Sequence, residues 1–301
     1  MAGDASVSGR AARGVLRSER GASSNRVVVY LGENPLVIVA IVFLLIVVVA
    51  AVSAPWVAPR DPAKMVPVDR LRPPGTREYL LGTDSFGRDL LSRVIWGGRI
   101  SLLAGVVPAL AATVIGVIIG LVSGYVGGRL DSLLMGLVDV VLAFPFMLLA
   151  IALVAALGPS LENAMLAVII STAPARVRLI RGVTLSLSTM PFVDAARALG
   201  YGPLRILFVE IMPNVLALAV TMFSIDITIM ITATAGLSFL GLGVQPPQAD
   251  WGTMIADGKQ FLSVAPHITI IPSLVLTLVC LSFGVIGDAV QDLLNPRALL
   301  E

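Results

Sequence analysis

Long apolar runs, separated by short polar or glycine-rich segments, dominate the sequence. The first run, Leu36–Ala54, carries no charged residue and has the length of about 20 residues that a helix needs to cross a bilayer. Further apolar runs follow at Ile100–Val122, Leu133–Leu157, Asn163–Ile180, Asn214–Ala235 and Pro266–Gly287. The pattern predicts an all-α, polytopic membrane protein, a bundle of about six transmembrane helices.

The residues before the first run are polar and include the arginines Arg10, Arg13, Arg17, Arg20 and Arg26. Their composition predicts a disordered cytoplasmic tail over residues 1–35. A cleaved signal peptide is the competing interpretation of the first run, because Ser53 and Ala54 are small. The run is longer than a usual signal-peptide core and follows a long polar segment, so we interpret it as a retained helix.

Prolines and glycines interrupt several of these runs. Pro108, Pro145 and Pro272 lie inside predicted spans, where lipid cannot satisfy the backbone groups that proline frees. Neighbouring helices must satisfy them, which predicts a packed bundle. The second span offers small residues that let another helix approach closely: Gly105, Ala111, Ala112, Gly116 and Gly120. The run that begins at Asn214 is too long for one span, and we expect the glycines of GLSFLGLG to end it.

An even number of spans puts both termini on the same side of the membrane. Lysine and arginine are only slightly more numerous on that side than on the other. We place the termini in the cytoplasm, because the arginines of the tail flank the first helix, which usually sets the orientation.

The composition supports a membrane location. Of the 301 residues, 57% are hydrophobic and 13% are charged, against about 25% charged in soluble domains. A net charge of +2 is too small to indicate nucleic-acid binding. The one cysteine, Cys280, lies inside an apolar run, which excludes a disulfide framework or a cysteine metal site within this chain.

The stretch between the fourth and fifth spans, Ser188–Asn214, carries sharp helix signals. Pro191 suits the first turn of a helix, and Gly200 suits the left-handed position that closes one. Pro203 can begin a second helix, and Pro213 is expected to prevent its continuation. The sequence therefore predicts two short helices that meet at a glycine corner.

The first of these helices is too short to be stable alone in water, because helix nucleation is costly. We expect Ala195 and Ala196 to form a smooth face against a partner, with Asp194 and Arg197 as polar contacts beside it. Asp194 lies near the helix start, where the macrodipole favours a carboxylate. A short rigid helix that a neighbour holds, and that is rooted in two membrane helices, can act as a lever.

This stretch resembles the signature loop of the permeases of ABC-type importers: Glu-Ala-Ala, three residues, Gly, nine residues, then Ile-any-Leu-Pro. Here the same spacing holds Asp194-Ala195-Ala196, Gly200 and Glu210-Ile211-Met212-Pro213. Aspartate replaces the usual glutamate, and Glu210 and Met212 also depart from the pattern. The resemblance implies that the loop docks into a separate ATPase subunit. The expected ATPase-coupling residues are Asp194, Ala195, Ala196, Arg197, Gly200, Arg205 and Pro213.

Further segments are similar to the second, C-type permease of dipeptide, oligopeptide and nickel importers. They are Leu81–Leu102, Leu237–Leu262 and the ending Gly287–Arg297. The resemblance implies a homologous second permease, two ATPase subunits and an extracytoplasmic solute-binding protein as partners. Candidate contacts with the binding protein are Asp84, Arg88, Gln245 and Trp251. The expected solute is a di- or oligopeptide or a related small solute, with nickel chelates and glutathione-like compounds left open.

The residues of these segments also have plain structural interpretations. Asp84 or Ser85 could cap a helix, and Arg88 could pair with Asp89. Trp251 could lie at the level of the lipid headgroups.

The resemblance also divides the chain into segments. A cytoplasmic tail (1–35), a first transmembrane helix (36–56) and an extracytoplasmic segment (57–98) are expected to precede the core permease domain (99–290). The coupling loop lies at 182–213, and a cytoplasmic tail (291–301) ends the chain.

Two aspartates, Asp139 and Asp226, fall inside apolar spans, where a carboxylate is costly unless it is paired, protonated or facing water. They either line a translocation path or tie helices together. The alternative function is a proton- or ion-coupled secondary transporter that uses both. An intramembrane aspartyl enzyme would need the two carboxyl groups close enough to share a proton.

The sequence contains no phosphate-binding loop. The segment from Gly252 to Gln260 comes nearest, but its spacing is wrong and it has Gln where Ser or Thr is needed. A single histidine also excludes a His-Glu-x-x-His zinc motif. We therefore expect a non-catalytic subunit that binds no cofactor, with ATP and Mg²⁺ on partner ATPase subunits.

Overall fold

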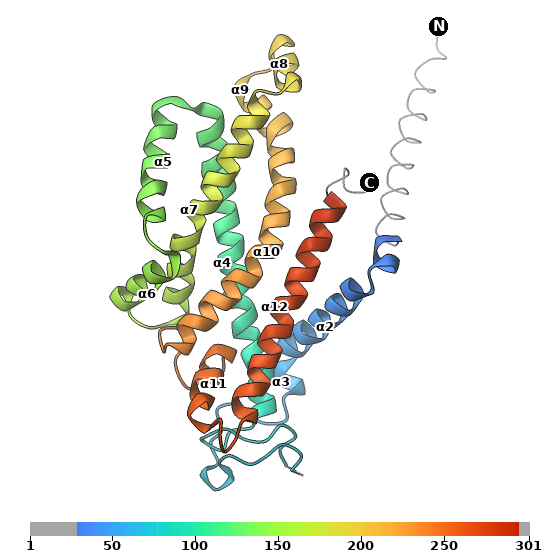
Figure 1. The fold of residues 1–301 in the computed structure, drawn as a ribbon, viewed down its shortest axis with the longest axis vertical. Helices are drawn as coiled ribbons and strands as arrows, with labels where there is room; N and C mark the ends of the chain where they lie inside the picture. The colour runs from blue at the N-terminus through green and yellow to red at the C-terminus, as the bar shows by residue number, and fades with distance from the viewer. Residues whose placement is uncertain (1–28, 77, 295–301) are drawn as a thin grey trace.

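The computed structural model describes residues 29–76 and 78–294, and their regular structure is helical apart from two isolated β-bridges (Figure 1). This confirms the all-α prediction. The elements are α2 (Pro35–Val52), α3 (Ala54–Val57), η1 (Pro67–Asp69), α4 (Leu90–Val126), α5 (Gly128–Leu142), α6 (Phe146–Leu157), α7 (Leu161–Ser188), α8 (Pro191–Ala198), α9 (Pro203–Arg205), η2 (Ile206–Ile211), α10 (Met212–Phe239), α11 (Trp251–Gly258), η3 (Lys259–Phe261) and α12 (His267–Leu294).

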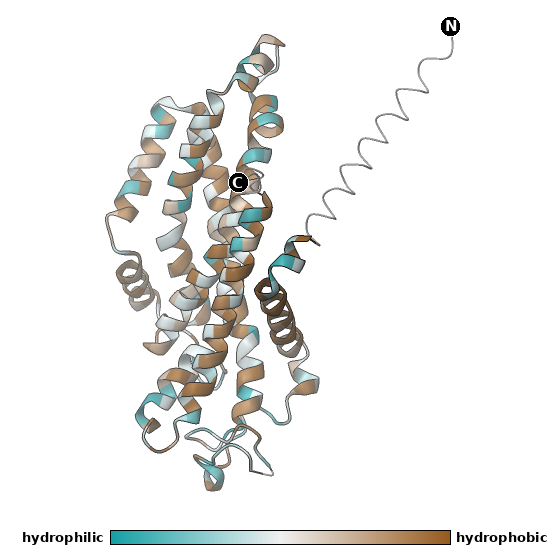
Figure 2. Cartoon of the chain, turned by 45° about the vertical axis from the view of Figure 1, so that its right-hand side comes forward, coloured by the Kyte–Doolittle hydropathy of each residue, from teal (hydrophilic) through white to brown (hydrophobic). Residues whose placement is uncertain are grey.

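Five helical stretches of the described residues are long and apolar enough to cross a membrane. They are α2, α4, α7, the stretch Pro203–Phe239 that ends with α10, and α12. A sixth crossing is possible only if α5 and α6 together form one span, and these two helices are bent by 86°. Figure 2 shows α2 as an almost uniformly hydrophobic helix on the outside of the bundle. The number of spans thus agrees with the sequence prediction. The third predicted span, however, is not one continuous helix.

The third predicted span, Leu133–Leu157, is broken where the sequence suggested one continuous helix. The break lies between Leu142 and Phe146, around Pro145. Proline has no N–H to continue the hydrogen-bond ladder, and it disfavours helical backbone in the residue before it. Helix α5 ends at Leu142, and the carbonyl of Pro145 begins the next helix by accepting from the N–H of Leu149.

Other helix ends shift for reasons that the side chains explain. Helix α4 starts at Leu90, well before the predicted Ile100, because the carboxylate of Asp89 accepts from the backbone N–H of Ser92 at 2.8 Å. Helix α10 ends at Phe239, and Gly241 follows with a positive φ of 78°. The prediction that glycines end this long run is therefore confirmed.

A row of glycines on α4 lets this helix lie directly against α7. A Cβ atom at Gly120 would come within 2.8 Å of the carbonyl oxygen of Val177, and one at Gly124 within 2.8 Å of that of Arg181. One turn earlier, a Cβ at Gly116 would lie 2.7 Å from the Cβ of Arg176. These distances are too short for any side chain, so the small residues of the second span do serve close helix packing.

Replacing Gly120 by alanine is expected to destabilise the folded protein by about 1–3 kcal/mol, because the added methyl group has no room at the α4–α7 contact. The melting temperature in detergent would report the change. Gly136→Ala in α5 is the matched control, since a Cβ there meets nothing within 4 Å. A Gly120→Ala protein that melts like Gly136→Ala would contradict the packing account.

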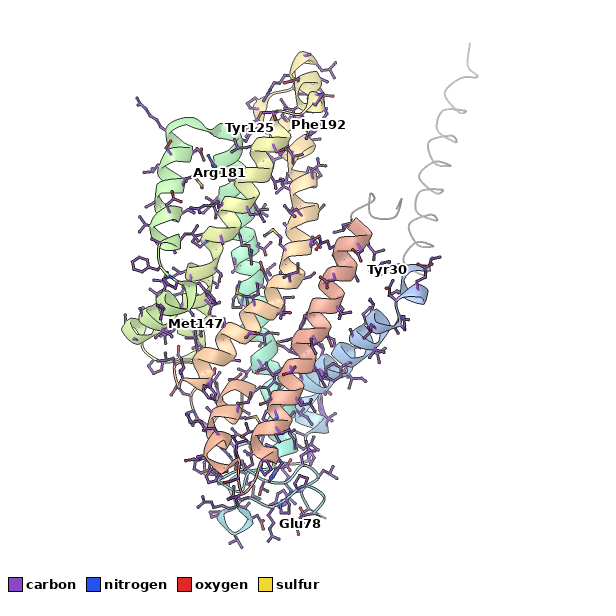
Figure 3. All side chains as sticks on the ribbon, in the orientation of Figure 1. Tyr30, Glu78, Tyr125, Met147, Arg181 and Phe192 are labelled. Carbon is purple, nitrogen blue, oxygen red and sulfur yellow. The ribbon has the colours of Figure 1, made fainter. Side chains whose placement is uncertain are left out.

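The two ends of the bundle are distinct. The loop of α8 and α9 lies at one end, and α11 with the irregular segment before α4 lies at the other (Figure 1). Figure 3 places Phe192 at the first end and Glu78 at the second.

The hydroxyl of Tyr30 donates to Asp292 at 2.7 Å, so the residues before α2 meet the end of α12. This hydrogen bond raises the pKa of Tyr30 to about 12. The predicted terminal tails lie mostly outside the described residues.

Candidate functional site

The short helix α8 packs against the helical segment that follows it in the same chain. Val193 and Ala196 are buried, and they join an apolar cluster with Ile206, Leu207 and Ile211 of the following helical segment. Burial of this face supplies the support that an isolated helix of eight residues lacks. The expected face of Ala195 and Ala196 is therefore divided: Ala196 points inward, and only Ala195 is exposed.

The glycine corner forms as the sequence predicts. Gly200 has a φ of +79°, and its N–H donates to the carbonyl of Arg197 at 2.9 Å. The next N–H, of Tyr201, reaches back to the carbonyl of Ala196 at 3.1 Å. This pattern closes a helix with a left-handed residue, which glycine adopts without steric cost.

The outer face of the loop is apolar and largely uncovered. The exposed fraction is 73% for Leu199, 70% for Leu204 and 39% for Phe192. Asp194 and Arg197 are exposed and pair with each other at 2.9 Å. The guanidinium of Arg205 stacks on the ring of Tyr201, 3.8 Å from its centre. The sequence reasoning did not single out these apolar residues, although Phe192, Ala195 and Leu199 recur at the spacing of one helix face.

Pro213 does not end the second helix, contrary to the sequence prediction. Helix α9 continues through η2, which is a π-helix, into α10. The wider π turn accommodates the proline, which has no backbone N–H to donate. The side-chain amide of Asn214 also donates to the carbonyl of Glu210 at 2.8 Å, which satisfies one carbonyl near the proline. The loop is thus rooted in two long helices, α7 and α10.

Helix α7 carries three arginines, and each of them forms an ion pair with an aspartate. Arg176 pairs with Asp226 of α10, and Arg178 pairs with Asp139 of α5. Arg181, labelled in Figure 3, binds both carboxylate oxygens of Asp131 at 2.5 and 2.6 Å.

The two intramembrane aspartates are in different surroundings. The side chain of Asp226 is 1% exposed, whereas that of Asp139 is 60% exposed and that of its partner Arg178 is 53% exposed. The two carboxyl groups are bound to different arginines and share no hydrogen bond. This arrangement gives no support to an aspartyl enzyme.

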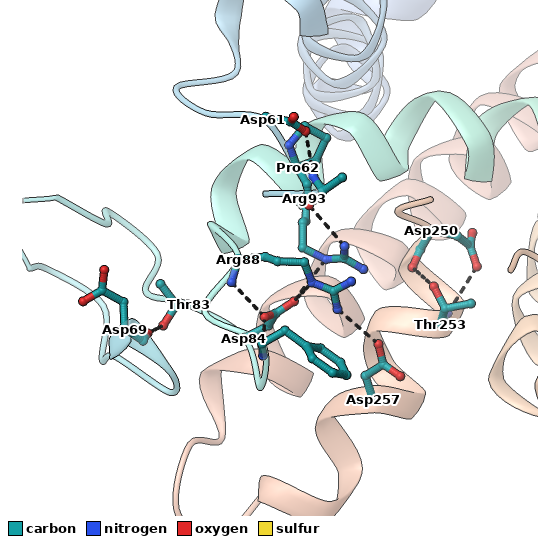
Figure 4. Close-up of polar contacts among 12 residues, drawn as sticks. Asp61, Pro62, Asp69, Thr83, Asp84, Arg88, Arg93, Asp250, Thr253 and Asp257 are labelled. Carbon is teal, nitrogen blue, oxygen red and sulfur yellow. Dashed lines mark hydrogen bonds and ion pairs between the residues drawn. The ribbon is translucent and has the colours of Figure 1, made fainter. Parts of the chain in front are cut away.

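At the opposite end, a buried carboxylate organises the segment before α4 (Figure 4). Asp84 accepts from the Nε of Arg88 at 2.6 Å, and the Nε of Arg93 lies 3.4 Å away. Arg88 also approaches Asp257 of α11 at 3.6 Å. All three residues of the core of this network, Asp84, Arg88 and Arg93, are almost fully buried. The sequence allowed Asp84 or Ser85 as a helix cap and Asp89 as a partner of Arg88, whereas Asp89 caps α4 and Asp84 binds Arg88 in the structure.

Trp251 is part of the interior at this end. Its side chain is 1% exposed, its Nε1 donates to the carbonyl of Val94 at 3.0 Å, and its ring packs on Gly97 and Gly98. It therefore does not lie at the lipid headgroups in this chain. The neighbouring Asp250 caps α11 by accepting from the N–H of Thr253 at 3.2 Å. Burial raises the pKa of Asp250.

A cleft of about 190 Å³, lined by polar and apolar residues, opens beside this network. Asp257 and Gln245 lie in its wall, and Gln245 is exposed. Burial raises the pKa of Asp257, against the effect of the nearby arginines. Of the binding-protein candidates, Gln245 is thus at the surface, whereas Asp84, Arg88 and Trp251 lie beneath it. Within the described residues, no group of three metal-ligating side chains could hold a metal ion.

Comparison with known proteins identifies related chains. Residues 116–299 match the family described as "Binding-protein-dependent transport system inner membrane component", and residues 26–74 match the "N-terminal TM domain of oligopeptide transport permease C". The di/tripeptide transport system permease protein DppC of Pseudomonas aeruginosa (strain UCBPP-PA14) is 40% identical over 262 residues, which cover 85% of this chain and 86% of that protein.

The glutathione transport system permease protein GsiD of Shigella boydii serotype 4 (strain Sb227) is also 40% identical, over 86% of this chain and 85% of that protein. The fold is similar to that of a chain of the MetNI methionine ABC transporter, solved in inward-facing conformations, with a TM-score of 0.53 at 19% identity. That match covers 66% of this chain and 95% of the other. The chain belongs to the family of binding-protein-dependent transport system inner membrane components and is a multi-pass permease subunit of an ABC importer.

Proposed function

We propose that the loop formed by α8, the Gly200 corner and α9 is the contact with a separate ATPase subunit. The observation that carries this proposal is the exposed apolar face of the loop, at the tip of two long membrane helices. Leu199 lies outside the helical stretches that are long enough to cross a membrane, and Leu204 lies in the first turn of one of them, Pro203–Phe239, at its loop end. A partner protein would cover them, because exposed apolar patches mark interaction sites.

The placement of the loop sets the proposed orientation. An ATPase is cytoplasmic, so the loop end of the bundle would face the cytoplasm together with both termini. ATP and Mg²⁺ would be bound by the ATPase, since this chain has no phosphate-binding loop. The permease itself would be a non-catalytic subunit. The coupling segment would be shorter than residues 182–213, because α7 continues to Ser188 and α10 begins at Met212.

The translocation path is proposed to lie between this chain and a homologous second permease. A charged pair in an apolar span is costly when it faces lipid. The exposed pair of Arg178 and Asp139 would therefore face the path. Asp226 is less suited to this role, because it is buried against Arg176. The related permeases are named for di/tripeptides and for glutathione, so we propose a short peptide or a peptide-like solute for this chain.

The opposite end is proposed to receive the solute-binding protein. The surface would be formed by residues 57–98 and 237–265, with Gln245 as a direct contact at the cleft beside Asp257. Asp84, Arg88 and Trp251 would contribute by holding this surface in shape. A homologous second permease and two ATPase subunits would complete the importer.

Replacing Leu199 by aspartate tests the ATPase contact. We expect the variant to bind the ATPase at least about tenfold more weakly, because a charge would be buried in an apolar contact. Co-purification of the two subunits from membranes measures the loss. Val126→Asp is the matched control: Val126 is 59% exposed, at the end of α4 that joins α5, and lies outside the loop. Undiminished ATPase binding by the Leu199→Asp variant would reject the proposal.

A further inference from the structure

We propose that the ion pair of Arg176 and Asp226 is a coupling brace: it ties α7 to α10 so that the two roots of the loop move as one body. The proposal rests on the proposed function, in which the ATPase moves this loop. It assigns Asp226 a positioning role that differs from lining the path.

The position of the pair suits this role. Arg176 lies about 18 Å from the end of α7 at Ser188, and Asp226 lies about 32 Å from the end of α9 at Arg205, by the helical rise of 1.5 Å per residue. The pair therefore joins the two helices well below the loop. Helices α7 and α10 contact each other along the way (Figure 1).

The chain and the ion pair together form a closed ring. It runs along α7 to α8, around the Gly200 corner, through α9 and η2, and back along α10 to Asp226. The interior of this ring near the loop is filled by the apolar cluster that includes Ile180, Val193 and Ile211. A force on α8 would reach both helices, and the ion pair would prevent them from separating below the cluster.

No other ion pair of the described residues links these two helices. Arg178 and Arg181 also lie on α7, but their partners Asp139 and Asp131 belong to α5, which is not a root of the loop. Helix α4 supports the brace from the side, because Gly116 lies directly against the stem of Arg176. The brace is therefore a specific contact, distinct from the other charged pairs of α7.

The chemistry of the pair allows movement without loss of contact. Asp226 is buried, and its second oxygen Oδ2 has no hydrogen-bond partner. The Nε of Arg176 is also buried and without a partner. The guanidinium thus has a spare donor and the carboxylate a spare acceptor, so the contact can pass from one oxygen to the other while α7 and α10 stay together. At no point would either charge be left alone in a medium of low dielectric constant.

The test uses the complete importer in lipid vesicles, with the ATPase and the solute-binding protein present. ATP hydrolysis and uptake of a radiolabelled dipeptide or glutathione are measured in the same vesicles, and their ratio is the readout. The double variant Arg176→Met with Asp226→Leu removes both charges, so that no unpaired charge stays buried. We expect it to assemble and hydrolyse ATP, with uptake per ATP reduced by about fivefold or more.

The exchanged pair, Arg176→Asp with Asp226→Arg, is expected to recover at least half of the lost ratio. Arg181→Met with Asp131→Leu is the matched control, because it removes an ion pair of α7 that does not reach α10. It should leave uptake per ATP unchanged even if it lowers the yield of folded protein. A wild-type ratio of uptake to ATP hydrolysis in the Arg176/Asp226 double variant would overturn the brace. This holds even if hydrolysis and uptake both fall, as long as their ratio is unchanged.

Failure of the brace can be told apart from failure of the proposed function. If the loop does not meet the ATPase, Leu199→Asp leaves ATPase binding intact. If only the brace is wrong, Leu199→Asp weakens ATPase binding while the double variant transports with an unchanged ratio.

Discussion

Replacing Gly200 by valine is expected to reduce solute uptake by about tenfold or more, while the permease stays folded and the ATPase continues to hydrolyse ATP. Gly200 has a φ of +79°, a conformation that costs a β-branched residue at least about 1–2 kcal/mol. A Cβ there would meet nothing within 4 Å, so the strain is confined to the backbone. The corner would relax and move Leu199 away from its position at the end of α8, which breaks the link between ATP hydrolysis and the membrane helices. Uptake and hydrolysis in the same vesicles measure the effect.

Gly202→Val is the matched control for this experiment. Gly202 lies two residues further along the same corner, and a Cβ there also meets nothing within 4 Å. Its φ of −69° and ψ of 158° are extended backbone, which valine adopts readily and which the following Pro203 favours. Asparagine at position 200 should keep most of the uptake, because it tolerates the left-handed region. Equal uptake by the Gly200→Val and Gly202→Val variants would refute the corner as the element that couples the subunits.

The second large effect is expected at the opposite end of the molecule, in the variant Asp84→Ala. Asp84 is 3% exposed and is the carboxylate that both Arg88 and Arg93 approach. Its removal leaves two buried guanidinium groups close to each other without their shared partner. Loss of one member of a buried ion pair costs about 3–5 kcal/mol. We expect a large drop in melting temperature and rapid proteolysis of the segment between residues 58 and 89.

Two further variants separate the charge of Asp84 from its other contacts. Asp84→Asn keeps an oxygen that can accept from the backbone N–H groups of Phe86 and Arg88, and it should fall between the wild type and the alanine variant. Glu78→Ala breaks an exposed ion pair with Arg60, which is 3.7 Å long, and should cost less than about 1 kcal/mol. If Asp84→Ala is as mild as Glu78→Ala, the network does not organise this end.

The sequence predicted features that depend on neighbours along the chain. The apolar runs gave the number of spans, and Gly200 gave the corner, because a left-handed residue after a short helix is a local signal. The small residues of α4 gave close packing, although not the identity of the partner helix. These signals need no knowledge of which helices meet.

Features that depend on contacts between distant residues were missed. The arginines of α7 find aspartates about 40 to 50 positions away, and nothing local indicates these pairs. Pro213 was expected to end a helix, because the π-helix that accommodates it is not visible in the residue pattern. Asp89 caps α4 where Asp84 or Ser85 was the suggested cap, because all three are good capping residue types and only the fold decides which carboxylate is buried against the arginines.

The bend between α5 and α6 has a consequence for how the protein is made. Helix α5 has 15 residues and α6 has 12, so they measure about 22 and 18 Å, and neither alone reaches across a hydrocarbon core of about 30 Å. The backbone groups at the break must also be shielded from acyl chains. Both helices contact α7, which is synthesised after them. Stable insertion of this part of the chain therefore has to wait until the ribosome has delivered α7, and the order of synthesis becomes part of the folding pathway.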